Sequence, residues 1–215
     1  MKRRDFSRSV LLACTAGALA PRAGAAEPKT ILVVGDSLSA EYGIARGTGW
    51  VALLEKRLSA EDIAARVVNA SISGDTSAGG RARLPALLKA HQPAIVVIEL
   101  GGNDALRGLS LDMTEANLAA MVQAARRSGA QVLLAGMQMP PNYGADYGRR
   151  FAALFASVAK AGGAALVPFL LAGVADRPDA ARLFQPDRIH PTAEAHPIIL
   201  ATVWPELAKL LKLKK

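Results

Sequence analysis

Short apolar runs alternate with amphipathic segments along the chain from about residue 30. Five runs rich in branched apolar residues are predicted to form β-strands, at 30–34, 66–72, 94–100, 131–135 and 164–167. Elsewhere apolar positions recur every three or four residues, which predicts helices at 49–60, 83–90, 113–127 and 147–161 and a last helix that begins near Pro197. In the first helix, for example, Trp50, Leu54 and Leu58 fall on one face.

This alternation predicts the fold class. Parallel strands need long crossover connections, usually helical, and repeated strand–helix alternation is typical of a parallel sheet with helices on both faces. We therefore predict an α/β protein with three layers, α/β/α, around a five-stranded parallel sheet. No internal repeat or linker divides residues 26–215, so we expect one domain there. The connections 136–146 and 168–189 are long, and such loops are often functional.

The first 25 residues have the pattern of an export signal. A basic start at positions 2–4 precedes a short apolar stretch at 10–20, and Ala23-Gly24-Ala25 fits the small-x-small cleavage pattern. The two arginines at positions 3 and 4 fit a twin-arginine signal as well as an ordinary secretion signal. Cys14 loosely resembles a lipoprotein box, but the apolar run continues past it. We predict a signal peptide at 1–25 and a periplasmic or secreted protein.

Removal of this segment changes the charge of the chain. The full sequence holds 26 basic and 18 acidic residues, a net charge of +8, but five of the basic residues and one of the acidic ones lie within 1–25. The remaining 21 and 17 leave +4, and the lysines near the C-terminus lack the arginines and aromatics of a nucleic-acid surface. Cys14 is the single cysteine, so the processed chain has no disulfide, thiol nucleophile or cysteine metal site. We expect no nucleic-acid partner, and no membrane span because the stretch at 10–20 is too short.

Residues suited to nucleophilic catalysis follow the first strand and end the second long connection. Ser37 comes directly after the first apolar run, and Asp187 and His190 lie three residues apart far downstream. A serine hydroxyl is a weak nucleophile at neutral pH and needs a base that is itself oriented by an acid. We therefore predict that His190 takes the Ser37 proton and that Asp187 orients and stabilises the imidazole.

Acyl transfer also needs fixed donors for the oxyanion. The Ser37 N–H, the Gly74 N–H and the Asn103 side-chain amide each follow a predicted strand, and we predict that they form the oxyanion hole. Removing one such donor typically costs about 3–4 kcal/mol of transition-state stabilisation. In doubly wound sheets ligands bind at the carboxyl ends of the strands, so we expect these groups to converge there.

Each of these residues taken alone has another explanation. Ser37 or Asn103 could cap a helix, Gly74 could be an ordinary turn glycine, and Asp187 with His190 could be a surface pair. His196 is a weak rival for the base. Their occurrence together and in this order favours a catalytic site.

Four segments resemble the conserved blocks of the SGNH, or GDSL, hydrolases. They are GDSLSAEYG at 35–43, NASISGDTS at 69–77, ELGGNDALRG at 99–108 and DRIHP at 187–191. The resemblance spans nearly all of the processed chain and implies a flavodoxin-like fold and no metal or cofactor. It assigns the nucleophile to Ser37, the base to His190 with Asp187, and oxyanion donors to Gly74 and Asn103. Glu41, where many members have glycine, and the stretch 144–147, which looks longer, depart from the pattern.

The residues and the resemblance together predict a serine esterase for acyl esters and thioesters: aryl esters, lysophospholipids and fatty acyl thioesters. An acyl chain needs an apolar groove, and the loops offer candidate lining residues, namely Leu106, Leu109, Met137, Met139, Pro140 and Tyr143. An O-acetyl esterase for cell-wall or exopolysaccharide sugars is the alternative. A non-catalytic flavodoxin-like binding module is more remote, because 35–38 has neither GxGxxG nor a P-loop lysine. We expect a monomer that acts on a small-molecule ester or thioester.

Overall fold

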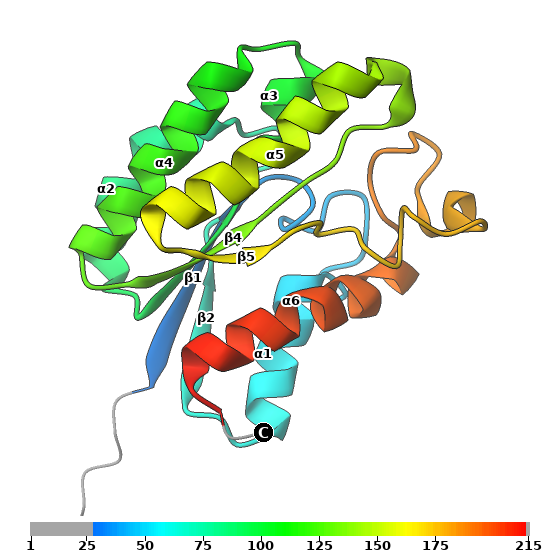
Figure 1. The fold of residues 1–215 in the computed structure, drawn as a ribbon. Coiled ribbons are helices and arrows are strands. Elements are labelled where there is room, and N and C mark those ends of the chain that lie inside the picture. Colours follow the sequence, from blue (N-terminus) through cyan, green and yellow to red (C-terminus); the bar gives the residue numbers. More distant parts are fainter. Residues whose placement is uncertain (1–27, 214–215) are drawn as a thin grey trace, which may run out of the picture.

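The computed structural model of the protein describes residues 28–213 (Figure 1). The predicted signal peptide at 1–25 lies outside the described residues. The elements in chain order are β1 (Lys29–Gly35), α1 (Trp50–Ala60), β2 (Ala65–Asn69), α2 (Ser77–His91), β3 (Ile95–Glu99), α3 (Gly102–Leu106), α4 (Leu111–Arg127), β4 (Gln131–Ala135), η1 (Pro141–Tyr143), α5 (Ala145–Gly162), β5 (Ala165–Val167), η2 (Ala180–Leu183), η3 (Ala193–Ala195) and α6 (His196–Leu211). Within the described part of the chain, no helix is long and apolar enough to cross a membrane.

The five strands form one parallel sheet in the order β2-β1-β3-β4-β5. Helices α1 and α6 cover one face, and α2, α4 and α5 cover the other (Figure 1). The predicted three-layer α/β/α fold is therefore confirmed.

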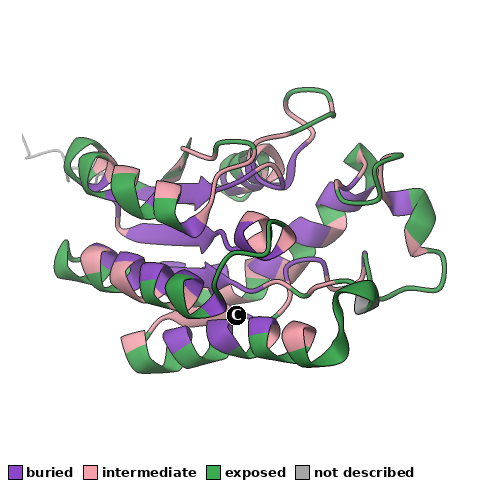
Figure 2. Ribbon diagram, turned by 90° about the horizontal axis from the view of Figure 1, so that it is seen from above, coloured by how far each residue is buried: buried purple, intermediate pink, exposed green. Residues whose placement is uncertain are grey.

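The sheet has a hydrophobic core on each face, and the alternation of side chains along β1 contributes to both. Ile31 and Val33 pack into the core under α1 and α6, whereas Leu32 and Val34 pack into the core under α2, α4 and α5. Successive strand residues point to opposite faces, so a strand covered on both faces must be apolar at every position. Figure 2 shows the result, with buried residues concentrated in the sheet and on the helix sides that face it.

Several element boundaries differ from the sequence predictions. Helix α2 begins at Ser77 rather than at residue 83, because the Thr76 hydroxyl caps it by accepting a hydrogen bond from the Gly79 N–H. Strand β2 ends at Asn69 instead of residue 72. The five-residue α3 was not predicted, since so short a helix shows no apolar periodicity.

The sheet topology determines where a ligand can bind. The chain passes from β1 to β2 on one side and then crosses to β3 on the other, so the strand order reverses between β1 and β3. In open parallel sheets the binding crevice lies outside the carboxyl ends of the strands at this point. Ser37 follows β1 and Asn103 follows β3, so both residues lie beside the crevice.

Candidate active site

The turn that carries Ser37 is fixed by its own backbone and by β3. The Asp36 side chain accepts a hydrogen bond from the Leu38 N–H at 3.0 Å, and the Asp36 carbonyl accepts one from Ala40 N–H at 3.0 Å. Gly35 is register partner to Glu99 on β3, and a Cβ at Gly35 would lie 2.7 Å from Glu99 Oε2. Only glycine leaves room for the Glu99 carboxyl beneath this turn.

Ser37, His190 and Asp187 form a connected hydrogen-bonded chain. His190 Nε2 lies 2.9 Å from Ser37 Oγ, and His190 Nδ1 lies 2.7 Å from Asp187 Oδ2. Both distances are within hydrogen-bonding range, although Ser37 and His190 are 153 positions apart in the sequence. A nucleophile, a base and an orienting acid in this order form the arrangement that activates a serine hydroxyl.

Asp187 is held within its own turn. Its Oδ1 accepts hydrogen bonds from the N–H groups of Ile189 at 2.9 Å and His190 at 3.0 Å, while Oδ2 faces the imidazole. The His190 N–H hydrogen bond chiefly, together with the imidazole and the Ile189 N–H, lowers the pKa of Asp187 to about 2. The carboxylate is therefore ionised at neutral pH and can hold the imidazole in the tautomer with hydrogen on Nδ1.

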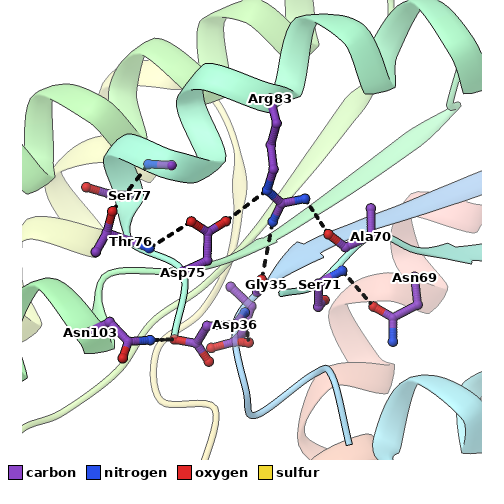
Figure 3. Close-up of polar contacts among 12 residues, drawn as sticks. Gly35, Asp36, Asn69, Ala70, Ser71, Asp75, Thr76, Ser77, Arg83 and Asn103 are labelled. Carbon is purple, nitrogen blue, oxygen red and sulfur yellow. Dashed lines mark hydrogen bonds and ion pairs between the residues drawn. The ribbon is translucent and has the colours of Figure 1, made fainter. Parts of the chain in front are cut away.

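The three predicted oxyanion donors follow three neighbouring strands: Ser37 comes after β1, Gly74 after β2, and Asn103 in α3 after β3. Among the described residues, neither the Ser37 N–H nor the Gly74 N–H has a hydrogen-bond acceptor. Gly74 has φ +78°, a conformation that favours glycine, and its carbonyl accepts from Arg107 Nη2 at 2.8 Å. Asn103 Nδ2 donates one hydrogen to Asp36 Oδ2 at 2.9 Å (Figure 3), which leaves its second hydrogen for another acceptor.

Two buried carboxyl groups support the Ser37 turn. Asp36 is only 3% exposed, and burial raises its pKa to about 6 despite its hydrogen bonds from Leu38 N–H and Asn103. Glu99 accepts hydrogen bonds from Ser39 Oγ at 2.7 Å and from the Asp36 N–H at 3.3 Å. Burial, followed by the charge of Asp36, raises the pKa of Glu99 well above its ordinary value. Sequence reasoning missed Glu99, although it is the single charged residue in the predicted strand 94–100.

Arg83 of α2 joins the ends of β1 and β2 to the Gly74 loop (Figure 3). Its guanidinium donates to Asp75 Oδ2 at 2.8 Å, to the Gly35 carbonyl at 3.3 Å and to the Ala70 carbonyl. The Arg83 guanidinium thus fixes both the backbone before Ser37 and the loop that carries Gly74, a predicted oxyanion donor. Sequence reasoning did not identify Arg83, because a helical arginine gives no signal of the strand ends it will contact.

A pocket of about 560 Å³ opens beside Ser37, Asn103 and His190. Of the six predicted substrate-binding residues, Leu106, Met137, Met139 and Pro140 line it, whereas Leu109 and Tyr143 are not among its lining residues. Four further apolar side chains that the sequence did not single out complete much of the wall: Leu38, Phe169, Leu171 and Phe184. The two long connections 136–146 and 168–189 therefore both contribute to the wall of one largely apolar pocket.

Comparison with known proteins matches residues 33–198 to the GDSL-like Lipase/Acylhydrolase family. This chain belongs to that family. Esterase TesA of Pseudomonas aeruginosa is 53% identical over 205 residues, which cover 95% of this chain and 100% of TesA. Thioesterase 1/protease 1/lysophospholipase L1 of Escherichia coli is 44% identical over 178 residues, which cover 83% of this chain and 82% of the relative.

The solved structures agree with the family assignment. A crystal structure of TesA has a TM-score of 0.81 and 55% identity to this GDSL hydrolase, and the match covers 85% of this chain and 99% of that one. These findings confirm the predicted resemblance and the hydrolase class. The protein is a carboxylic ester hydrolase.

Of the two departures from the GDSL pattern, Glu41 has a structural explanation. Glu41 has φ +59°, a conformation that favours glycine, and its Oε1 accepts hydrogen bonds from Gly47 N–H and Gly49 N–H, both at 2.8 Å. The carboxylate thereby fixes the loop that leads into α1. The stretch 144–147 contains Gly144 at φ +91° and the first residues of α5.

His196, the weak rival for the base, and Asp104 have structural roles in this hydrolase. His196 is buried and its Nδ1 accepts a hydrogen bond from the Trp50 N–H at 3.0 Å, so that nitrogen is already engaged. Burial lowers the pKa of His196 to about 4. Asp104 accepts hydrogen bonds from the N–H and hydroxyl of Ser77, which ties α3 to the start of α2. Within residues 28–213 no group of three or more His, Cys, Asp or Glu side chains could hold a metal ion.

Proposed function

We propose that this hydrolase cleaves acyl esters and thioesters through an acyl-enzyme on Ser37. The substrates would be aryl esters, lysophospholipids and fatty acyl thioesters. The observation that carries the proposal is the hydrogen-bonded chain from Ser37 through His190 to Asp187 at the mouth of a largely apolar pocket. The relatives, which are named as an esterase and as a thioesterase and lysophospholipase, support the same substrate classes.

Acylation begins when Ser37 Oγ attacks the carbonyl carbon of the ester while its proton passes to His190 Nε2. Asp187 stabilises the imidazolium ion that forms. The negative charge on the former carbonyl oxygen is accepted by the N–H groups of Ser37 and Gly74 and by the second Asn103 amide hydrogen. When the tetrahedral intermediate collapses, the C–O or C–S bond breaks and the departing alkoxide or thiolate takes the proton from His190.

Deacylation repeats these steps with water as the nucleophile. His190 removes a proton from the water, the resulting hydroxide attacks the acyl carbon, and the Ser37 oxygen leaves and recovers its proton from the imidazolium. The carboxylic acid is released and the free enzyme is regenerated. This cycle consumes one water for each ester or thioester and needs no further reactant.

The pocket favours acyl chains longer than acetyl. A volume of about 560 Å³ with many apolar lining residues exceeds what an acetyl group needs and is typical of sites for larger ligands. We expect kcat/KM to rise from acetyl toward longer acyl groups in a series of p-nitrophenyl esters and matching thioesters. A preference for acetyl together with cleavage of acetylated glycan would support the O-acetyl esterase alternative instead.

The decisive variant is Ser37→Ala. It should lower the turnover of a p-nitrophenyl ester by about four to six orders of magnitude, because the acyl-enzyme can no longer form. Circular dichroism and urea unfolding should match the wild type, and a fluorophosphonate probe should label the wild type alone. Turnover by Ser37→Ala near the wild-type rate would disprove the mechanism, and loss of wild-type activity in EDTA would point to a metal.

We further propose that residues 1–25 direct export and that the processed enzyme is a monomer without a nucleic-acid partner. The basic start, the short apolar stretch and the Ala23-Gly24-Ala25 site support export. Fractionation of cells that express the full chain, with mass spectrometry of the recovered N-terminus, tests the first point. Size-exclusion chromatography with light scattering tests the second. Enzyme retained in the cytoplasm with its N-terminus intact would contradict export.

A further inference from the structure

The aromatic ring of Tyr42 lies against the imidazole of His190. The ring centroids are 4.3 Å apart and the ring planes are inclined at 37°. Tyr42 is nevertheless 50% exposed, so burial alone does not account for its position. Sequence reasoning gave Tyr42 no role, since nothing in the local pattern relates it to a residue almost 150 positions away.

Backbone hydrogen bonds fix Tyr42 between the nucleophile and the base. The Tyr42 N–H donates to the Ser37 carbonyl at 3.4 Å, and the Tyr42 carbonyl accepts from Gln185 Nε2 at 2.9 Å. The same Gln185 nitrogen donates to the Pro191 carbonyl at 3.0 Å, and the Gln185 N–H donates to the His190 carbonyl at 2.8 Å. Gln185 therefore joins the Tyr42 backbone directly to both ends of the His190–Pro191 unit.

The preceding residue holds the chain in the conformation that this contact needs. Glu41 has φ +59°, and its carboxylate is bonded to two N–H groups of the following loop. A glutamate in this conformation is sterically strained, whereas a glycine would not be. Its hydrogen bonds offset that strain and fix the backbone from which the Tyr42 ring projects.

We infer that Tyr42 is a positioning residue for His190. The hydrogen bonds at Nδ1 and Nε2 define an axis through the imidazole, and neither bond by itself prevents the ring from tilting about that axis. The Tyr42 ring packs against the imidazole and restricts this tilt. When Ser37 gives up its proton, the imidazole becomes a cation within about 6 Å of an aromatic centroid, the range in which aromatic rings stabilise cations. This inference rests on the proposed function, in which His190 is the base.

The contact uses the ring of Tyr42 and not its hydroxyl. Among the described residues, the Tyr42 hydroxyl makes no hydrogen bond. Tyr42→Phe should therefore keep the effect and Tyr42→Leu should lose it, which makes the two variants a matched pair. Because Tyr42 is half exposed, both variants should fold, and urea unfolding checks this.

The rate of reaction with a fluorophosphonate probe measures activation of Ser37 with little dependence on acyl-chain binding. Tyr42→Leu should react about 3- to 10-fold more slowly than the wild type, the effect expected from losing one aromatic contact to the imidazolium. Its kcat for a p-nitrophenyl ester should fall by a similar factor with little change in KM. Tyr42→Phe should match the wild type in both measurements.

A spectroscopic measurement tests the geometry without catalysis. The chain has only three histidines, so the imidazole C–H signals can be resolved by NMR and that of His190 assigned with a His190→Gln variant. The ring current of Tyr42 should displace the His190 signals from their positions in Tyr42→Leu, and Tyr42→Phe should preserve the displacement. A purely structural role for Tyr42 in the loop would not produce this pattern.

Three results would overturn the inference. The first is a Tyr42→Leu variant that reacts with the probe at the wild-type rate. The second is an equal loss of probe rate and kcat in Tyr42→Leu and Tyr42→Phe. The third is a change in KM alone, which would mean that Tyr42 contacts substrate. Failure of the proposed function is distinguished by Ser37→Ala: if that variant retains turnover, the nucleophile assignment itself is wrong whatever Tyr42 does.

Discussion

The two sides of this site are built in different ways: the nucleophile side, with the predicted nucleophile Ser37, and the base side, with the predicted base His190 and Asp187. Ser37 lies on a turn whose neighbours are held by groups from distant elements: the buried Glu99 of β3 and the partly buried Asn103 of α3 and Arg83 of α2. Asp187 and His190 instead lie on a turn that is bonded mostly within itself, and the Asp187 side chain is 39% exposed.

This difference predicts which substitutions change both catalytic activity and stability and which change activity alone. On the nucleophile side, a side chain that positions Ser37 is also part of the buried polar network, and its removal leaves buried groups unpaired. On the base side, most of the hydrogen bonds join residues only a few positions apart, so their loss hardly affects the rest of the fold. Substitutions on the first side should therefore change both properties, and substitutions on the second should change activity alone.

Among these variants, Asp187→Asn should show the largest loss of activity for the smallest loss of stability. It should lower kcat by about 10³- to 10⁴-fold, because a neutral amide no longer stabilises the imidazolium or fixes its tautomer. The free energy of unfolding should change by less than about 1 kcal/mol, as is usual for an exposed side chain. Ester kinetics and urea unfolding measure the two effects.

The control for this variant is Asp179→Asn in the same long connection, where Asp179 forms ion pairs with the exposed Arg177 and Arg182. It should leave kcat unchanged. A loss of several kcal/mol of stability in Asp187→Asn would show that the base side is not the locally held region described here.

Asn103→Ala should lower kcat by about 10²- to 10³-fold, the effect of removing one oxyanion donor. It should also lower the free energy of unfolding by about 1 kcal/mol, because the buried Asp36 loses a hydrogen bond. Asn142→Ala, at an exposed asparagine of η1, is the control for both measurements. A rise in KM with kcat intact would assign Asn103 to substrate binding instead.

Arg83→Met should lower stability by about 2–3 kcal/mol, since Asp75 and two backbone carbonyls lose their donor. We expect a roughly tenfold fall in kcat as the Gly35 and Gly74 segments loosen, consistent with the sensitivity of catalysis to small misplacements. Arg81→Met, two residues earlier on α2, removes only a contact to Asn117 and should do much less. Equal losses in the two variants would contradict a special role for the Arg83 contacts.

Asp36→Asn should show a pH-dependent effect on stability. The pKa of Asp36 is raised from 3.8 to about 6 in the folded protein. The folded state therefore binds this proton more tightly than the unfolded state, and ionisation destabilises the wild type as the pH rises through about 4 to 6. Relative to the wild type, Asp36→Asn should gain about 2 kcal/mol of unfolding free energy between pH 4 and pH 8.

Urea unfolding at the two pH values measures this gain, and hydrogen bonds lost equally at both values cancel in the difference. Asp62→Asn, at an exposed aspartate beyond α1, serves as the control. An Asp36→Asn difference that stays constant or falls with pH would mean that the Asp36 carboxylate is not a destabilising buried charge.

The sheet was predictable because its chemistry is local and repetitive. A strand buried on both faces is apolar at nearly every position, and the predicted strand 131–135 coincides with β4. The start of α2 was placed six residues late, because small residues between Ser77 and Arg83 conceal the helical period and the Thr76 cap carries the signal instead. Neither α3 nor the short η helices extend far enough to show a period.

The site was predictable only in part, for a related reason. Ser37 was named for its place after a strand, and Asp187 and His190 for their residue types and spacing; the structure joins all three in one hydrogen-bonded chain. Their catalytic roles, like those of Gly74 and Asn103, remain predictions. The contact of Tyr42 with His190 and the bridge through Gln185 depend on three-dimensional proximity between distant segments, which no local pattern encodes.

The separation of Ser37 and His190 by 153 positions has a consequence for the biosynthesis of this enzyme. On the ribosome the serine emerges early and the imidazole very late. In the proposed mechanism, a nascent chain shorter than 190 residues carries the Ser37 hydroxyl without the base that activates it. Such a chain therefore does not hydrolyse acyl esters near the ribosome. A product of premature termination before His190 is likewise inactive.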